Sequence, residues 1–393
     1  MNIFVIPSWY PSTSKCIKGI FFKEQALAIG KQRPEWNVGI CLWWPDRYQM
    51  ALRKFFLWPY IFHRYWFSRK RVPLSKNVIE YHTPVLEWSR RFVSESKQFE
   101  RAYLAIKRNL TQFQAEFGKV DLIHAHVGSP AGLFASQLKR ELGIPYVITE
   151  HYGPFPPEHF LDENSALKNE IQGAYQNASA VLSVSPAHAA KMTSMGVSSV
   201  QIVPNCINEE FFQSKGKHEG KKTFFCLATR LCPEKGIDDL LHAAKVFFQN
   251  RPNFTLRIGG EGDLNAYRKM APLPQIEFLG PLTREQVLNE MQSCSCFILP
   301  SHQESFGVSY AEALAVGKPV IATRCGGGEY VVQEDQGILV PVKSPDLIAD
   351  AMMQMSSRFN SYDEKKIRAA CLARFSTKAV VDQLETIYRS VQL

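Results

Sequence analysis

The stretch that decides the fold is residues 301–313, SHQESFGVSYAEA, in the C-terminal half of the chain. An apolar run, residues 296–300, comes directly before it and predicts a buried strand. The apolar residues after it suit a short helix that ends at Gly317. We therefore expect Glu304 in the loop at the carboxyl end of a strand, with Glu312 about two turns into the next helix.

The start of this helix predicts a binding site for an anion. The backbone N–H groups of Phe306, Gly307 and Val308 would point out of the helix start, where the helix dipole favours negative charge. Two carboxylates beside such a helix start suit a ligand that carries both hydroxyls and phosphate, such as a nucleotide sugar. Two glutamates taken alone fit a solvated loop residue and a surface helix residue equally well.

The composition is that of a globular protein. A chain of 393 residues is long enough for two domains, each with its own core. Residues 1–7, MNIFVIP, predict a first strand rather than a signal peptide, and no stretch of about 18 uncharged apolar residues is present to span a bilayer. The nine cysteines are irregularly spaced and predict neither a zinc site nor disulfides, so we expect a cytoplasmic protein.

The positive charge is concentrated in the N-terminal half. Residues 1–200 hold 24 Lys and Arg against 15 Asp and Glu, which accounts for the whole net charge of +9 and indicates an anionic partner. Residues 47–76 contain eight basic and no acidic side chains, interleaved with aromatic ones. This mixture predicts peripheral contact with an anionic membrane. A pair of core-packed helices whose charges face water is the alternative, and nucleic acid is not expected.

Short apolar runs alternate with helical patterns along both halves. This alternation predicts an α/β fold with parallel sheets, whose ligands bind beyond the carboxyl ends of the strands. A polar stretch without periodicity, residues 214–222, predicts a surface loop between the halves. The expected strands are 2–7, 37–43, 78–82, 120–125, 145–149, 180–184, 223–228, 254–259, 276–279, 296–300, 319–323 and 337–340. The expected helices include 20–32, 95–116, 131–142, 165–177, 186–195 and 376–391.

Other candidate site residues follow predicted strands. Arg230 and Lys235 would place two cations at a strand end, where they can neutralise a diphosphate. Such a pair taken alone is more often two surface charges, but the neighbouring Glu304 loop favours a phosphate site. Gly19 precedes a helix and suits either a phosphate loop or a plain turn. His126 and His151 end two neighbouring strands, although a lone histidine is more often structural.

The stretch 301–313, together with GKPVIAT at 317–323 and GGGE at 326–329, resembles the Glu-x7-Glu region of the retaining glycosyltransferase family 4. The resemblance covers nearly the whole chain. It implies that Glu304 touches the hydroxyls of the donor sugar and Glu312 those of the ribose, with Ser305, Phe306, Gly307 and Val308 also binding the donor.

Other motifs carry the same resemblance. The stretch TRLCPEKG at 229–236 resembles the Arg-Leu-x-x-x-Lys-Gly motif of the family, although Thr229 replaces the usual glycine. The loop at 258–263, which fails as a dinucleotide fingerprint, would place Glu261 near the nucleotide base. The resemblance places His126 by the donor sugar and diphosphate and His151 on the acceptor side, and Gly19 would be what remains of a glycine-rich loop. We assign His126, Arg230, Lys235 and Glu304 as catalytic.

The resemblance implies a GT-B fold, in which two Rossmann-like domains face each other across a cleft. Residues 1–203 would bind the acceptor and residues 204–375 the nucleotide sugar, with a last helix in 376–393 that crosses back to the first domain. The implied reaction is metal-independent, retaining transfer from a nucleotide sugar, a UDP-sugar rather than a GDP-sugar, with no separate cofactor. The acceptor would be a glycan or lipid-linked molecule at the inner face of the plasma membrane. An epimerase or hydrolase of the same fold, and an inactive membrane-binding scaffold, are the alternatives.

Overall fold

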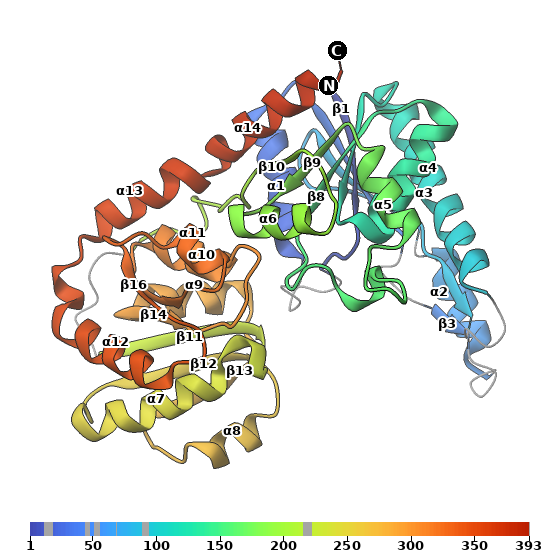
Figure 1. The fold of residues 1–393 in the computed structure, drawn as a ribbon. Helices are drawn as coiled ribbons and strands as arrows, with labels where there is room; N and C mark the ends of the chain where they lie inside the picture. The colour runs from blue at the N-terminus through green and yellow to red at the C-terminus, as the bar shows by residue number, and fades with distance from the viewer. Residues whose placement is uncertain are drawn as a thin grey trace.

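Two α/β domains make up the computed structural model (Figure 1), which describes residues 1–11, 19–43, 48–50, 56–67, 69–88, 94–214 and 222–392. The loop expected at 214–222 and the segment expected at 47–76 therefore lie partly outside the described residues. The first sheet contains strands from residues 2–202 and the second contains strands from residues 223–340.

The N-terminal domain is built on an eight-stranded sheet in the order β10-β9-β8-β7-β1-β2-β5-β4. Neighbouring strands are parallel except at the edge, where β4 runs antiparallel to β5. The strands are β1 (Asn2–Pro7), β2 (Asn37–Leu42), β4 (Lys70–Pro73), β5 (Val78–His82), β7 (Leu122–His126), β8 (Tyr146–Glu150), β9 (Ala180–Ser183) and β10 (Val200–Ile202), with a separate parallel pair, β3 (Tyr48–Met50) and β6 (Leu86–Trp88).

Helices cover both faces of this sheet, as the alternation of side chains along β1 requires. Ile3 and Val5 pack in one buried cluster with α1, whereas Phe4 and Ile6 pack in another with α3 and α4. The helices of the domain are α1 (Ile20–Gln32), α2 (Trp58–Phe67), α3 (Glu95–Phe117), α4 (Leu133–Leu142), α5 (Asn169–Gln176) and α6 (Pro186–Ser194).

The C-terminal domain is built on a six-stranded, fully parallel sheet in the order β13-β12-β11-β14-β15-β16. Its strands are β11 (Thr223–Arg230), β12 (Thr255–Glu261), β13 (Ile276–Gly280), β14 (Cys296–Leu299), β15 (Val320–Thr323) and β16 (Gly337–Val340). Its helices are α7 (Ile237–Asn250), α8 (Leu264–Met270), α9 (Arg284–Ser293), α10 (Val308–Val316), α11 (Gly327–Val331), α12 (Pro345–Arg358) and α13 (Glu364–Phe375). The order places β11 beside β14, so the loops that follow these two strands are neighbours.

Some expectations about elements were wrong. The helix expected at 165–177 begins only at Asn169, because Asp162 Oδ1 accepts hydrogen bonds from the backbone N–H groups of Asn164 and Ala166 and holds this stretch in a loop. The helix expected at 131–142 is present as α4, directly preceded by a π-helical turn over Gly128–Gly132. The first sheet is not wholly parallel, because its edge strand β4 is a polar, exposed segment without the apolar run that would announce it.

The last helix, α14 (Thr377–Ser390), leaves the C-terminal domain and packs on the N-terminal one (Figure 1). Its buried apolar face joins the cluster that contains α1 and β1. The apolar members from α14 lie three or four residues before and after Leu384, as one face of a helix requires: Val380, Val381, Leu384, Ile387 and Tyr388.

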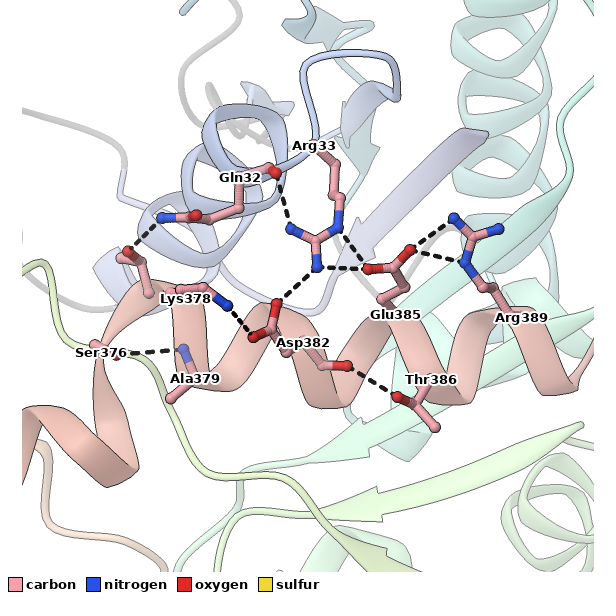
Figure 2. A network of polar contacts seen from close by, with 10 residues as sticks. Gln32, Arg33, Ser376, Lys378, Ala379, Asp382, Glu385, Thr386 and Arg389 are labelled. Atoms are coloured by element: carbon pink, nitrogen blue, oxygen red, sulfur yellow. Dashed lines mark hydrogen bonds and ion pairs between the residues drawn. The ribbon is translucent and has the colours of Figure 1, made fainter.

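Polar contacts also hold α14 against the N-terminal domain. Figure 2 shows Arg33, which follows α1, between two carboxylates of α14, with Nη2 2.7 Å from Asp382 Oδ1 and Nε 2.6 Å from Glu385 Oε2. On the buried side the Tyr388 hydroxyl lies 2.6 Å from His124 Nδ1. Because His124 Nε2 also lies 2.7 Å from Thr149 Oγ1, both ring nitrogens are paired.

Replacing Tyr388 by Phe should lower the free energy of unfolding by about 1–3 kcal/mol, because His124 Nδ1 would lose its partner in a buried site. Urea unfolding measures this change. The matched control is Thr386→Ala, which removes an exposed hydroxyl of the same helix and should change the free energy by less than about 0.5 kcal/mol. Equal effects of the two substitutions would show that the Tyr388–His124 contact contributes nothing.

Candidate active site

A cleft of about 570 Å³ lies between the two domains at the carboxyl ends of both sheets. The N-terminal domain contributes residues from the loop after β1, the start of α1 and the loop after β8, among them Trp9, Gly19, Ile20, Phe21, His151 and Tyr152. The C-terminal domain contributes Arg230, Lys235, Glu261, Arg284, Glu304, Ser305, Phe306, Gly307, Val308 and Glu312. All the predicted site residues except His126 therefore line one cavity.

Lys235 and Glu304 form an ion pair inside this cleft. Lys235 Nζ lies 2.7 Å from Glu304 Oε1, and the Ser301 hydroxyl donates to the same oxygen at 2.8 Å. Although burial disfavours the charged amine, the Glu304 carboxylate raises the pKa of Lys235 above its ordinary value. Lys235, in the loop after β11, is therefore a cation of the site. Its ion pair occupies Oε1 of Glu304, one of the two carboxylate oxygens.

A glycine allows the two loops to meet. Gly236 follows Lys235 with φ 66°, and a Cβ at this position would lie 1.9 Å from the carbonyl oxygen of Pro300. Only a residue without a side chain permits this contact. The same approach lets His302 N–H donate to the carbonyl of Glu234 at 2.8 Å.

Helix α10 begins as expected, with small differences. Gly307 is its N-cap residue at φ 86°, and Phe306, which lines the cleft, is 1% exposed. Glu312 is the fifth residue of α10, so it lies just over one turn into the helix instead of about two. Gly317 ends the helix in the left-handed conformation.

Arg284 is a site residue that the sequence reasoning missed. It begins α9 and contacts the Glu312 carboxylate, which is 3% exposed, through Nη1. Burial raises the pKa of Glu312 above its ordinary value, and the adjacent guanidinium offsets only part of that rise. Arg284 follows the predicted strand 276–279. This position could have identified it as a site residue, since side chains at strand ends of one parallel sheet converge.

The two domains also touch directly through Ser305. Its hydroxyl donates to the carbonyl of His151 at 3.0 Å, and its own carbonyl accepts a hydrogen bond from the Ser185 hydroxyl at 2.5 Å. The backbone of Gly153 packs so closely on Ser305 that a Cβ would lie 3.1 Å from Ser305 N. His151, Gly153 and Ser305 all line the cleft.

His126 and His151 occupy different positions relative to the cleft. His151 lines it, whereas His126 is 1% exposed and lies beneath His151 and the Phe22 ring. The two rings are joined by a hydrogen bond of 3.1 Å between His126 Nδ1 and His151 Nε2. The other nitrogen of His151, Nδ1, is buried and has no partner. His126 therefore reaches the cleft only through His151.

A buried carboxylate holds the strand ends that carry these histidines. Glu150 accepts hydrogen bonds from the N–H groups of His151 and Tyr152 through Oε1, at 2.8 and 2.9 Å. Its Oε2 accepts from Gly128 N–H at 2.9 Å and from the Tyr175 hydroxyl at 2.6 Å. Four donors on one carboxylate fix the loops after β7 and β8 relative to each other.

Gly19 and Glu261 lie at opposite walls of the cleft. Gly19 precedes α1 at φ 78°, and a Cβ there would lie 2.6 Å from the Trp9 ring, so the turn requires glycine. Glu261 ends β12 with an exposed side chain. Within the described ranges, no three His, Cys, Asp or Glu side chains are grouped as ligands of one metal ion.

Acid should destabilise the N-terminal domain, because burial holds the pKa of His124 near 3 and lowers those of His126, His151 and His188. Below pH 6.5 the unfolded chain binds protons that the folded chain does not, so the free energy of unfolding falls as pH falls, by up to about 1.4 kcal/mol per pH unit for each histidine. Urea midpoints at pH 7.5 and 5.5 measure this loss. His242→Gln, an exposed control, should keep the same profile, and equal midpoints at the two pH values would contradict the prediction.

Two family models match adjacent parts of the chain. The model described as Glycosyltransferase Family 4 matches residues 60–211, and the model described as Glycosyl transferases group 1 matches residues 208–370. Among curated proteins, an uncharacterized glycosyltransferase of Methanocaldococcus jannaschii is 28% identical over 71% of this chain and 75% of that protein. The phosphatidyl-myo-inositol mannosyltransferase of Mycobacterium tuberculosis is 29% identical over 51% of this chain and 56% of that protein.

Solved structures share the fold over the full length. Sucrose-phosphate synthase of Thermosynechococcus elongatus superposes with a TM-score of 0.74 at 18% identity, covering 99% of this chain and 98% of that one. HepE of Anabaena, in complex with UDP and glucose, superposes with a TM-score of 0.67 at 18% identity, covering 99% of this chain and 100% of that one. The predictions of an α/β fold and of family 4 resemblance are confirmed. The chain belongs to the family 4 type of glycosyltransferases and has the GT-B fold.

Proposed function

We propose that this glycosyltransferase moves a sugar from a nucleotide diphosphate sugar to a glycan or lipid-linked acceptor, with retention at the anomeric carbon and without a metal ion. The observation that carries the proposal is the Lys235–Glu304 pair, at 2.7 Å, beside the start of α10. A fixed cation, a carboxylate and helix-start N–H groups meet at one point. A sugar with hydroxyls on one side and a diphosphate on the other needs these three kinds of group.

The donor would lie against the C-terminal domain. Glu304 would accept hydrogen bonds from the sugar hydroxyls through its second oxygen and Glu312 from the ribose, while the N–H groups at 305–308 and the loop at Gly19 meet the diphosphate. Glu261 would lie near the base. We propose a uridine rather than a guanosine donor, and the complex of the fold relative HepE with UDP and glucose supports this choice.

The chemical step is attack by an acceptor hydroxyl on the anomeric carbon, from the same face that the diphosphate leaves. The bond from this carbon to the phosphate oxygen breaks, its electron pair stays on that oxygen, and the same oxygen takes the acceptor proton. Arg230 and Lys235 would stabilise the charge that develops on the departing diphosphate. Glu304 and Glu312 are engaged by Lys235 and Arg284, so neither carboxylate is placed as a free general base.

His151 would bind a hydroxyl of one of the two sugars. His151 lines the cleft, and its Nδ1 is a buried polar atom without a partner, which is costly unless a ligand or water pairs with it. His126 would fix the orientation of the His151 ring through their shared hydrogen bond. We therefore propose that His126 positions His151 and does not touch the substrates.

The acceptor domain would approach an anionic membrane through the segment around α2, at the inner face of the plasma membrane. Figure 1 places α2 at the end of the N-terminal domain that faces away from the C-terminal domain. Four large apolar side chains are exposed there, at 67% for Phe56, 37% for Leu57, 60% for Tyr60 and 44% for Phe62. Exposed basic residues, Arg69 and Lys70, follow them. Among the described residues, no helix has the length and apolar character to cross a bilayer.

Arg230→Ala and Lys235→Ala should each lower turnover by about 100- to 1,000-fold, because each removes a charge that meets the leaving diphosphate. The measurement is nucleotide release from a panel of UDP- and GDP-sugars with glycan and lipid-linked acceptors, with and without a metal chelator. The control is Arg251→Ala, which removes an exposed cation outside the residues that line the cleft.

Near wild-type turnover in both variants, or loss of activity on chelation, would overturn the assignment. Release that does not depend on acceptor would instead indicate a hydrolase or an epimerase. A protein that binds vesicles but no nucleotide would be an inactive scaffold. Urea unfolding of each variant separates lost activity from lost folding.

The protein should bind vesicles that contain phosphatidylglycerol at low salt and should dissociate at high salt, because part of the attraction is screened. Co-sedimentation measures the bound fraction. Phe56→Ser with Tyr60→Ser should weaken binding, whereas Leu104→Ser, an exposed apolar residue of α3, should not. Retention that ignores salt, or no binding at any salt, would contradict the membrane proposal.

A further inference from the structure

The Arg284 guanidinium joins carboxylates from both domains. Its Nη2 lies 2.8 and 2.9 Å from the two oxygens of Glu24, on α1 of the N-terminal domain. Its Nη1 contacts Glu312, on α10 of the C-terminal domain. The central carbon of the group, Cζ, lies 4.5 Å from the Phe212 ring centre and 5.5 Å from that of Phe211, in the segment that connects the domains.

The side chains of Arg284, Glu24 and Glu312 are largely buried, so each charge is stabilised mainly by the opposite charge beside it. The side chains of Arg284 and Glu24 are 15% and 12% exposed, and that of Glu312 is 3% exposed. A carboxylate in such a site stays ionised only beside a cation. Nε of Arg284 is buried without a partner, so the contacts of the guanidinium with the two carboxylates are made through Nη1 and Nη2.

The two partners of Arg284 differ in their relation to the cleft. Glu312 and Arg284 line it, whereas Glu24 is not among the lining residues and faces Arg284 from the other domain. When the domains are together, both oxygens of Glu24 hold the single nitrogen Nη2 of Arg284 and so fix the direction from which Arg284 meets Glu312. The contact of Arg284 with Glu312 lies within the C-terminal domain, whereas its contact with Glu24 exists only when the two domains are together.

We propose that Arg284 is a positioning residue that couples the ribose site at Glu312 to contact between the domains through Glu24. The inference rests on the proposed function, because it takes the ligand at Glu312 to be the ribose of a nucleotide. With the domains together, one oxygen of Glu312 remains for the ribose hydroxyls. If contact between the domains raises the affinity for the nucleotide by some factor, then the bound nucleotide shifts the equilibrium toward contact between the domains by the same factor.

The test compares UDP with 2′-deoxy-UDP by titration calorimetry on the full chain. The wild type should prefer UDP, because 2′-deoxy-UDP lacks a hydroxyl that Glu312 would bind. Glu24→Gln should lower the affinity for UDP on the order of tenfold and bring the ratio of the two affinities toward one. The matched control is Glu210→Gln, which removes the exposed ion pair between α1 and the connecting segment and should change neither quantity.

Arg284→Lys is a second test variant, because lysine keeps the charge but cannot hold two carboxylates with a planar guanidinium group. It should lose the same discrimination. Adding Glu24→Gln to it should then cost nothing further, since partners in one network do not act additively. This variant also keeps the test open if Glu24→Gln folds poorly.

Two results would overturn the inference: wild-type affinity and discrimination in Glu24→Gln, or effects of Glu24→Gln and Arg284→Lys that simply add. In either case a wild type that binds UDP and transfers sugar would leave the proposed function intact. A wild type that binds neither UDP nor GDP would remove the proposed function itself, and the inference with it.

Discussion

The burial of Glu312 and the partial burial of Glu304 are the constraint on which the site depends, because removing a carboxylate from water is costly unless a cation pairs with it. Each carboxylate receives its cation from a different strand end. Lys235 comes from the loop after β11 and can reach Glu304 because β11 and β14 are neighbours. Arg284 comes from the loop after β13.

Contacts between the two domains occur in two places, one near the cleft and one far from it. Near the cleft, Arg284 and Ser305 connect the C-terminal domain to Glu24, His151 and Ser185. Far from the cleft, α14 is attached by its apolar stripe and by the Arg33 and Tyr388 contacts (Figure 2). The far attachment involves about the whole length of a helix, whereas the near contacts are a few polar groups. The near contacts are thus the ones that a ligand in the cleft can influence.

Much of this structure could be predicted from local pattern. Buried parallel strands are continuous apolar runs, so most strands of both sheets were found within one or two residues of their observed bounds. Edge segments such as β4 and β10 lack that run and were missed. The Glu304 loop was found because its motif is contiguous. The Arg284–Glu24 contact was not predicted, because 260 positions separate the two residues and no periodicity links them. His126 was placed in the cleft, yet it lies beneath His151, since burial by Phe22 is a tertiary effect.

The return of α14 has a consequence for how the chain is made. Residues of the second sheet lie between two stretches that belong to the first domain, so the C-terminal domain is an insertion in the covalent order of the N-terminal one. A ribosome releases α14 only after every strand of both sheets has been synthesised. Until then the part of the α1 and β1 cluster that α14 covers stays exposed. The first domain made is therefore the last one completed, and the inserted domain can finish folding before it.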